Sequence, residues 1–283
     1  MKSIRIGCVK YLNARPLIRG WPGDVEFDHP SSLCKRLANG ELDVALVSSF
    51  EFLRNPIYRI VDDVSISSDG SVYSVVVAHH GRISDVEEIE LDPASQTAVN
   101  LLRCLLAEKA LRPRLIGNID LQSVRPAGLQ PAARDAAENI SAGRTGNMPM
   151  SLTARRARLL IGDQAIRFRQ QYAKEFSFWD LGEQWKKLIG LPFVYALWLI
   201  RPEVADPKAI ADRLRDLRDE NLANLDEVIA TDKKFDPQFC SRYYREYLRF
   251  NFEENEKEGL RSFAKRCAQC DLLPKRDLEL DLA

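Results

Sequence analysis

The amino-acid sequence predicts an α/β fold with two lobes and a ligand cleft between them. Short apolar strands alternate with helices along much of the chain, which is the pattern of a mainly parallel sheet covered by helices. A length of 283 residues is enough for two domains. Two longer apolar runs, residues 71–80 and 193–202, are placed where we expect the chain to pass from one lobe to the other and back.

The first strand–turn–helix segment lies near the N-terminus. An apolar run at residues 4–9 is followed by the turn Tyr11, Leu12 and Asn13, and then by a helix that we expect to begin near Pro16. Proline is favoured in the first turn of a helix, because the N–H that it lacks has no partner within the helix there. The turn therefore places an aromatic, an apolar and an amide side chain directly after a strand.

Three further segments repeat this order of strand, turn and helix. The strand "DVALV" leads to the turn Ser48–Ser49, and the strand "EIEL" leads to a turn at residues 92–97. The strand in "RLLIGD" leads to Gly162 and Asp163, and a helix follows. The repetition favours a parallel arrangement in which all four turns lie at the carboxyl ends of strands.

The two long apolar runs divide the predicted fold into its lobes. We expect a discontinuous first lobe, residues 1–90 plus 191–283, and a second lobe, residues 91–190. Residues 119–157 mix Pro, Gly, Asn and Arg, and this composition predicts a surface insertion into the second lobe.

The C-terminal part of the chain is predicted to be helical. Residues 207–230 and 236–270 have apolar side chains at helical spacing. We expect one aromatic stripe of the second range to be core: Phe239, Tyr243, Tyr244, Tyr247 and Leu248.

The composition excludes several classes of partner. Lys+Arg and Asp+Glu both number 41, so no net charge favours nucleic acid or a membrane surface. Neither a signal peptide nor a membrane-spanning run is recognisable, and we expect a cytoplasmic protein. The six cysteines predict buried free thiols. The pair Cys267 and Cys270 has no second Cys or His cluster beside it, so no metal site is predicted.

The predicted binding residues are those of the four turns, because ligands of open parallel sheets bind outside the carboxyl ends of the strands. Two of these turns, around Ser48 and around Ser95, also open helices. Each is either an ordinary N-cap or an anion site, and two such turns facing one cleft favour a ligand with two carboxylates. Asp163 either caps its helix or touches the ligand. The expected substrate-binding set is Tyr11, Leu12, Ser48, Ser49, Ser95, Gln96, Thr97, Gly162 and Asp163, with Asn13 beside it.

Signatures of nucleophilic, zinc or phosphate chemistry are absent from the sequence. No Gly-rich phosphate loop, HExxH or GxSxG motif is present, and three histidines offer no evident catalytic triad. The residues alone therefore leave a receptor and an enzyme equally open.

Several blocks of the sequence, taken in order, resemble the chorismate dehydratases of the futalosine route to menaquinone. They include "YLNARPLI", "GELDVALVSSFEFLR", "LDPASQTAVNLLRCLL", "LLIGDQAI" and "DLGEQWKKLIGLPFVYALW". The resemblance implies a two-lobed fold like that of type II periplasmic binding proteins. It also implies conversion of chorismate to 3-[(1-carboxyvinyl)oxy]benzoate with loss of water, without metal or organic cofactor.

The resemblance also assigns roles to residues. Asn13 and Ser74 are implied to be the catalytic residues, and the turn Ser95–Thr97 is implied to bind a substrate carboxylate. The chain departs from the family in two places. Lys10 stands where a small or neutral residue is common, and the turn 94–97 lacks the family's usual arginine, which weakens the expected carboxylate site.

Two alternatives stay open beside this interpretation. One is the sister enzyme of the same pathway, which acts on cyclic dehypoxanthine futalosine. The other is a non-catalytic binding protein for small anions. The expected partner is chorismate as substrate, without nucleic acid or membrane, and the sequence leaves monomer and homodimer open.

Overall fold

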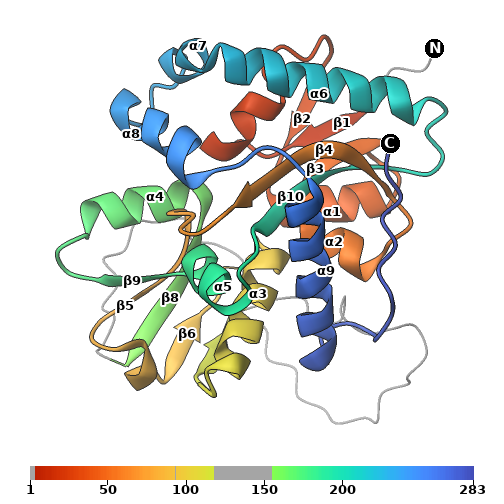
Figure 1. The fold of residues 1–283 in the computed structure, drawn as a ribbon. Coiled ribbons are helices and arrows are strands. Elements are labelled where there is room, and N and C mark those ends of the chain that lie inside the picture. The colour runs from red at the N-terminus through yellow and green to blue at the C-terminus, as the bar shows by residue number, and fades with distance from the viewer. Residues whose placement is uncertain (1–3, 93, 118–154) are drawn as a thin grey trace, which may run out of the picture.

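Within residues 4–92, 94–117 and 155–283, which the computed structural model describes, two five-stranded sheets form the two halves of the molecule (Figure 1). The first sheet has the strand order β2-β1-β3-β10-β4. Its strands β1, β2 and β3 are parallel, and β10 is antiparallel to both β3 and β4. The bounds are β1 (Ile6–Cys8), β2 (Val25–Phe27), β3 (Val44–Ser48), β4 (Arg59–Ser68) and β10 (Phe193–Ile200).

The second sheet has the strand order β7-β6-β8-β5-β9. Strands β6, β7 and β8 are parallel, and β5 is antiparallel to its neighbours β8 and β9. The bounds are β5 (Val75–His79), β6 (Glu88–Glu90), β7 (Arg114–Ile116), β8 (Arg156–Ile161) and β9 (Ser177–Asp180). Arg155, Arg156 and Arg158 form ion pairs with Glu87, Glu88 and Glu90 across β6 and β8, so these arginines are engaged within the sheet.

Helices cover both sheets, and α6 runs across the top of the first sheet in Figure 1. Those of the first half are α1 (Pro30–Ala38), α2 (Ser49–Arg54), α6 (Pro207–Ala223), α7 (Leu225–Ala230), α8 (Pro237–Arg242) and α9 (Glu254–Gln269). Those of the second half are α3 (Gln96–Glu108), α4 (Gly162–Gln171) and α5 (Leu181–Ile189). The 3-10 helices η1 (Leu12–Leu17) and η2 (Ile83–Asp85) and the π turn η4 (Tyr243–Tyr247) complete the described elements.

One apolar core continues through both halves. Buried side chains from β3, α3, β8 and α9 belong to the same cluster, because α3 packs against α2 and α9 across the boundary. The predicted aromatic stripe is part of this core, with Tyr243 fully buried and Tyr247 packed at its edge. Burial of this kind is the main favourable term in folding, so the two halves stabilise each other.

The alternation of strands and helices is confirmed. The sheets are mainly parallel, as predicted: in each sheet one strand, β10 or β5, runs antiparallel to both of its neighbours, and the other strands point the same way. Two details of the prediction are wrong. The first helix is a 3-10 helix that begins at Leu12, and Pro16 lies inside it rather than in its first turn. The boundary at residue 90 is also wrong, because β5 and β6 already pair within the second sheet. The chain crosses between the sheets after β4 and again before β10.

Strand β4 was not recognisable from the sequence, because it ends in the polar run "SISS". Two of its serines contact a distant segment: the Ser65 hydroxyl donates to the carbonyl of Asn251 at 2.6 Å, and Ser67 pairs with Arg249. That segment also interrupts the predicted helix 236–270, because it separates α8 and η4 from α9. The predicted insertion at 119–157 lies almost wholly outside the described residues.

Candidate functional site

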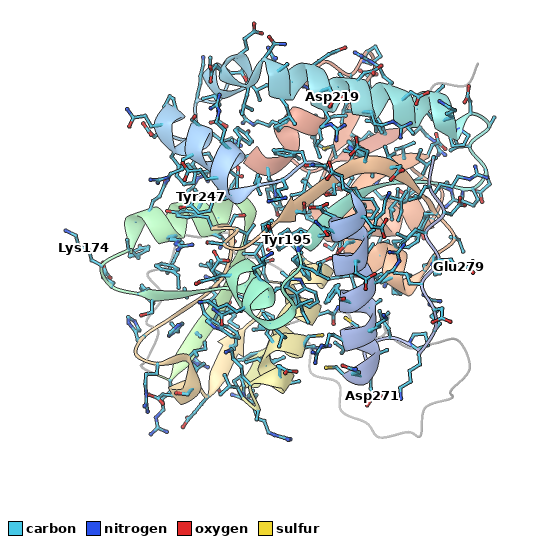
Figure 2. All side chains as sticks on the ribbon, in the orientation of Figure 1. Lys174, Tyr195, Asp219, Tyr247, Asp271 and Glu279 are labelled. Carbon is cyan, nitrogen blue, oxygen red and sulfur yellow. The ribbon has the colours of Figure 1, made fainter. Side chains whose placement is uncertain are left out.

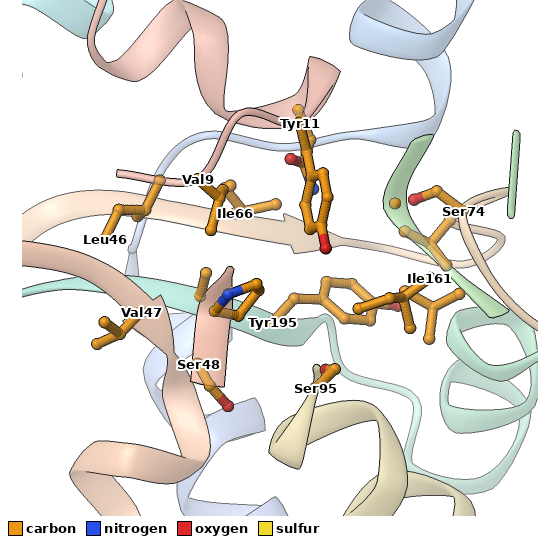
Figure 3. A pocket seen from close by; sticks show the side chains of 16 residues that line it. Val9, Tyr11, Leu46, Val47, Ser48, Ile66, Ser74, Ser95, Ile161 and Tyr195 are labelled. Atoms are coloured by element: carbon orange, nitrogen blue, oxygen red, sulfur yellow. The ribbon is translucent and has the colours of Figure 1, made fainter. Parts of the chain in front are cut away.

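A pocket lies where the two sheets meet, and side chains from both halves line it (Figure 3). Most of its wall is apolar and comes from both halves: Val9, Pro30, Leu46, Val47, Ile66, Val72, Val75, Ile161 and Ala196. The polar part of the wall consists of Tyr11, Asn13, Ser48, Ser74, Ser95, Gly162 and Tyr195. Within the described parts of the chain, no carboxylate, histidine, lysine or arginine lines this pocket. The wall therefore suits a ring-sized ligand held by hydroxyl and amide groups.

The turn between β1 and η1 is clamped from two sides. The N–H of Leu12 donates to Oδ1 of Asp163 at 2.8 Å, and the hydroxyl of Tyr244 donates to the carbonyl of Leu12 at 2.8 Å. With its neighbour fixed, Asn13 faces the pocket, and its buried Oδ1 has no hydrogen-bond partner among the described residues. A buried polar atom without a partner costs about 1–3 kcal/mol, and because Asn13 also lines the pocket, its Oδ1 is available to accept a hydrogen bond from a ligand.

Tyr11 stands over Gly162, at the start of α4. Gly162 has a φ of +55°, and a Cβ atom at this position would lie 3.0 Å from the ring of Tyr11. Both the backbone conformation and the close approach require glycine. Burial, with the nearby carboxylates of Asp92 and Asp163 adding to it, raises the pKa of Tyr11 to about 12, so its hydroxyl remains a hydrogen-bond donor at neutral pH.

Asp163 does not line the pocket. Its side chain is buried behind the turn, where it accepts the Leu12 N–H, and Nζ of the half-exposed Lys234 lies 4.0 Å from its other oxygen. Burial raises the pKa of this carboxyl, while the Leu12 N–H and the charges of Lys234 and Arg167 partly oppose the rise. Its position fits a structural acceptor for the turn.

The starts of α2 and α3 face each other across the boundary between the sheets. The N–H of Thr97 donates to Oγ of Ser48 at 3.1 Å, and the N–H of Phe50 donates to Oγ1 of Thr97 at 3.1 Å. The hydroxyls of Ser48 and Thr97 are themselves hydrogen-bonded. Ser95 caps α3 by accepting the N–H of Ala98 at 3.2 Å. Each helix start thus supplies partners for the other, and Ser48 and Ser95 also face the pocket.

The chain crosses to the second sheet just before Ser74, and this crossing is held by a buried carboxylate. Asp180 accepts hydrogen bonds from the hydroxyl of Ser71 at 2.7 Å and from the N–H of Tyr73 at 2.8 Å. Tyr73 has a φ of +67°, a left-handed conformation that is costly for a tyrosine. The N–H of Gly162 then donates to the carbonyl of Ser74 at 2.8 Å, which fixes the main chain of this pocket residue.

The structure divides the residues predicted to bind into two groups. Those on the pocket wall are Tyr11, Asn13, Ser48, Ser74, Ser95 and Gly162. Those not on the wall are Leu12, Ser49, Gln96, Thr97 and Asp163. Of the second group, Thr97 and Ser49 are engaged with each other and with neighbouring elements, at 3.3 Å between their hydroxyls.

Tyr195 is the polar wall residue that sequence reasoning missed. It lies near the centre of the molecule, where the sheets meet, and its hydroxyl is 3.0 Å from Oγ of Ser68 (Figure 2 and Figure 3). The available signal was a single tyrosine within the otherwise apolar run 193–200. Its direction toward the pocket depends on the antiparallel pairing of β10, which the sequence did not indicate.

The described residues contain no group of His, Cys, Asp and Glu side chains arranged to hold a metal ion. Their helices also include none that is long and apolar enough to cross a membrane. All six cysteines are free thiols, and Sγ of Cys104 on α3 lies 3.8 Å from Sγ of Cys267 on α9.

Comparison with known proteins gives matches over nearly the whole chain. A family model described as menaquinone biosynthesis matches residues 4–137 and 131–269. The chain is 29% identical over 289 residues to a chorismate dehydratase of Thermus thermophilus, covering 94% of this chain and 95% of that protein.

Two solved structures share the fold. A protein of Archaeoglobus fulgidus has a TM-score of 0.67 at 16% identity, with 95% of this chain and 98% of that chain covered. A Candida albicans protein, described as having the generic periplasmic binding protein fold, has a TM-score of 0.58 at 11% identity, with 98% and 92% covered. These identities are low enough that the two structures show the fold alone, which agrees with the predicted fold class.

Proposed function

The chain belongs to the menaquinone biosynthesis family, and from that premise we propose that it is a chorismate dehydratase. The reaction converts chorismate to 3-[(1-carboxyvinyl)oxy]benzoate and water, which makes the enzyme a carbon–oxygen lyase. The observation that carries the proposal is the pocket wall, where Asn13 and Ser74 from different halves face an apolar space beside two serine-bearing helix starts. The likeness to a chorismate dehydratase over 94% of the chain supports the choice of substrate.

The reaction removes the hydrogen at C3 and the hydroxyl at C4 of chorismate, and it leaves an aromatic ring. Aromatisation supplies much of the driving force. The protein has three remaining tasks: to hold two carboxylates, to bring a base to C3 and to stabilise the departing oxygen. Each task needs a particular chemical group near the ring.

The base, we propose, is the carboxylate of the substrate's own enolpyruvyl arm. Among the described residues, none that lines the pocket has a carboxylate or imidazole side chain, and Asp163 accepts the Leu12 N–H behind the wall. Holding the arm within reach of C3 makes the proton transfer intramolecular. Well-oriented intramolecular groups of this kind lower a barrier by up to about 7–11 kcal/mol.

Asn13 is the group proposed to stabilise the departing oxygen. Its side-chain amide lies at the end of a clamped turn, and the N–H groups of an amide donate to an oxygen that gains negative charge. The hydroxyl of Ser74 is proposed to hold the enolpyruvyl arm. Ser48 and Ser95, at the two helix starts, are the proposed donors for the ring carboxylate. Hydroxyls replace the arginine that this turn lacks.

The test is incubation of the purified protein with chorismate. We expect an aromatic product whose ultraviolet spectrum and mass match chorismate minus water, and we expect Asn13→Ala to form it far more slowly. Calorimetry with chorismate in the same buffer measures binding separately. Binding without any product would contradict the proposed lyase activity and would favour a small-anion binding protein.

A further inference from the structure

The hydroxyl of Ser74 contacts a tyrosine from a distant part of the chain. Tyr243, in the π turn η4, is fully buried, and its hydroxyl donates to Oγ of Ser74 at 2.7 Å. The two residues are 169 positions apart in the sequence. Ser74 lines the pocket, whereas Tyr243 lies behind it. The direct hydrogen-bond route from Tyr243 to a ligand therefore passes through the serine.

The direction of this hydrogen bond decides what Ser74 can do. A phenol has one hydrogen, and here it is given to Ser74, whose oxygen is the acceptor. Burial raises the pKa of Tyr243 far above its usual range, and the carboxylates of Asp163 and Asp180 add to the rise. The phenol therefore keeps its proton at any pH at which the protein is studied. The hydrogen of the Ser74 hydroxyl is left for another acceptor.

Both partners are held rigidly. The ring of Tyr243 stacks on Phe239, with centroids 5.7 Å apart and an angle of 15° between the planes. The main chain of Ser74 is fixed by the N–H of Gly162 and by the crossing segment that Asp180 holds. Neither group can turn away without breaking buried contacts, so the hydroxyl hydrogen of Ser74 has few directions open to it other than the pocket.

We propose that Tyr243 is a positioning residue that keeps Ser74 a hydrogen-bond donor aimed at a carboxylate oxygen of the substrate. Accepting a hydrogen bond also polarises the serine O–H, which strengthens its own donation. The inference rests on the proposed function for the identity of the substrate. The geometry of the tyrosine and the serine does not depend on it.

The experiment is a double-mutant cycle on chorismate turnover, with Tyr243→Phe, Ser74→Ala and the double variant. We expect Tyr243→Phe to lower kcat/KM by up to about 10²-fold, the typical cost of a misplaced reacting group. In the Ser74→Ala background the same change should have less than about a twofold effect, because its target is gone. Tyr58→Phe is the matched control, since Tyr58 is also fully buried and does not line the pocket.

A second variant separates positioning from loss of structure. Replacement of Tyr243 by 4-aminophenylalanine keeps a donor at the same place on the ring, and we expect it to restore most of the activity lost in Tyr243→Phe. The inference is overturned if Tyr243→Phe folds and keeps wild-type kcat/KM, if the two effects are additive, or if the folded amino variant is as slow as the phenylalanine variant.

Failure of the proposed function would look different from failure of this inference. An inactive wild-type protein would contradict the dehydratase assignment. The same cycle would then be measured on chorismate affinity by calorimetry, with the same expected loss of additivity. Additive or absent effects on affinity would again overturn the role of Tyr243.

Discussion

Replacement of Asp163 by asparagine decides whether the enzyme or the substrate supplies the base. Asp163 lies in one of the predicted turns, yet it accepts the Leu12 N–H at 2.8 Å and does not line the pocket. Asparagine has nearly the same shape and keeps an oxygen that accepts this hydrogen bond. The variant therefore removes the charge and the basicity while it retains the clamp on the turn.

The size of the effect follows from these contacts. A hydrogen bond to a charged group contributes about 1.5–3 kcal/mol and a neutral one about 0.5–1.5 kcal/mol, so the clamp should weaken by roughly 1–1.5 kcal/mol. Lys234 lies 4.0 Å away and its side chain is 48% exposed, so loss of that ion pair adds little. Even if the whole loss appeared in the transition state, kcat would fall only about tenfold. Removal of a general base typically costs about 10²–10⁴ in rate.

The stability of the same variant should depend on pH in a defined direction. Burial raises the pKa of Asp163 above its usual value, so the wild-type protein loses stability as pH rises through that pKa. Asparagine does not titrate. The free energy of unfolding of Asp163→Asn relative to wild type should therefore increase from acidic to neutral pH, as measured by urea unfolding at a series of pH values.

The assay compares kcat, KM and chorismate affinity of wild type and Asp163→Asn at neutral pH. We expect a decrease in kcat of tenfold or less. If turnover is abolished while folding and chorismate binding survive, Asp163 is the base and substrate assistance is wrong.

Three further predictions concern the turn, the glycine and the thiols. Asn13→Ala should lower kcat by about 10²–10³-fold while calorimetry still detects chorismate binding; unchanged kcat would remove Asn13 from the chemistry. Gly162→Ala and Gly190→Ala both place alanine at positive φ, so each variant should lose about 1–2 kcal/mol of stability in urea unfolding. Only Gly162→Ala displaces the ring of Tyr11, so only this variant should also raise KM. Equal KM values in the two variants would show that Tyr11 does not contact the substrate. Cys267→Ser buries a hydroxyl beside Cys104 and should cost about 1–3 kcal/mol of stability, whereas partly exposed Cys270→Ser should change it by less than about 0.5 kcal/mol. Turnover of both thiol variants, and of wild type treated with a chelator, should stay normal, and a chelator-sensitive rate would contradict a metal-free reaction.

The sequence predicted those parts of the site that depend on the order of neighbouring residues along the chain. Strand ends followed by polar turns predicted the position of the pocket, and they placed Asn13 and Ser48 on its wall, because the carboxyl ends of parallel strands meet at one edge. Ser74 came from the resemblance to a family and not from any local pattern.

Other features depend on contacts that no local pattern records. The hydroxyl of Thr97 is directed at the start of α2, which only the packing of α3 across the boundary determines. The same holds for Tyr195, whose side-chain direction follows from the pairing of β10 with β4. The role of Tyr243 needed a contact spanning 169 positions. In the sequence these residues look like ordinary core or capping residues. Their roles depend on contacts between segments that are far apart in the chain.

The reciprocal contacts between the starts of α2 and α3 have a consequence for ligand affinity. The N–H of Thr97 is a donor of the kind that an anion needs, and here it donates to Oγ of Ser48, whose hydroxyl is also hydrogen-bonded to that of Thr97. A carboxylate arriving at this edge competes with the protein's own hydroxyls as well as with water. This internal competitor weakens binding of substrate and of product alike. The proposed product keeps both carboxylates of the substrate. Its release should be faster because the groups that it leaves at the two helix starts can hydrogen-bond to each other again.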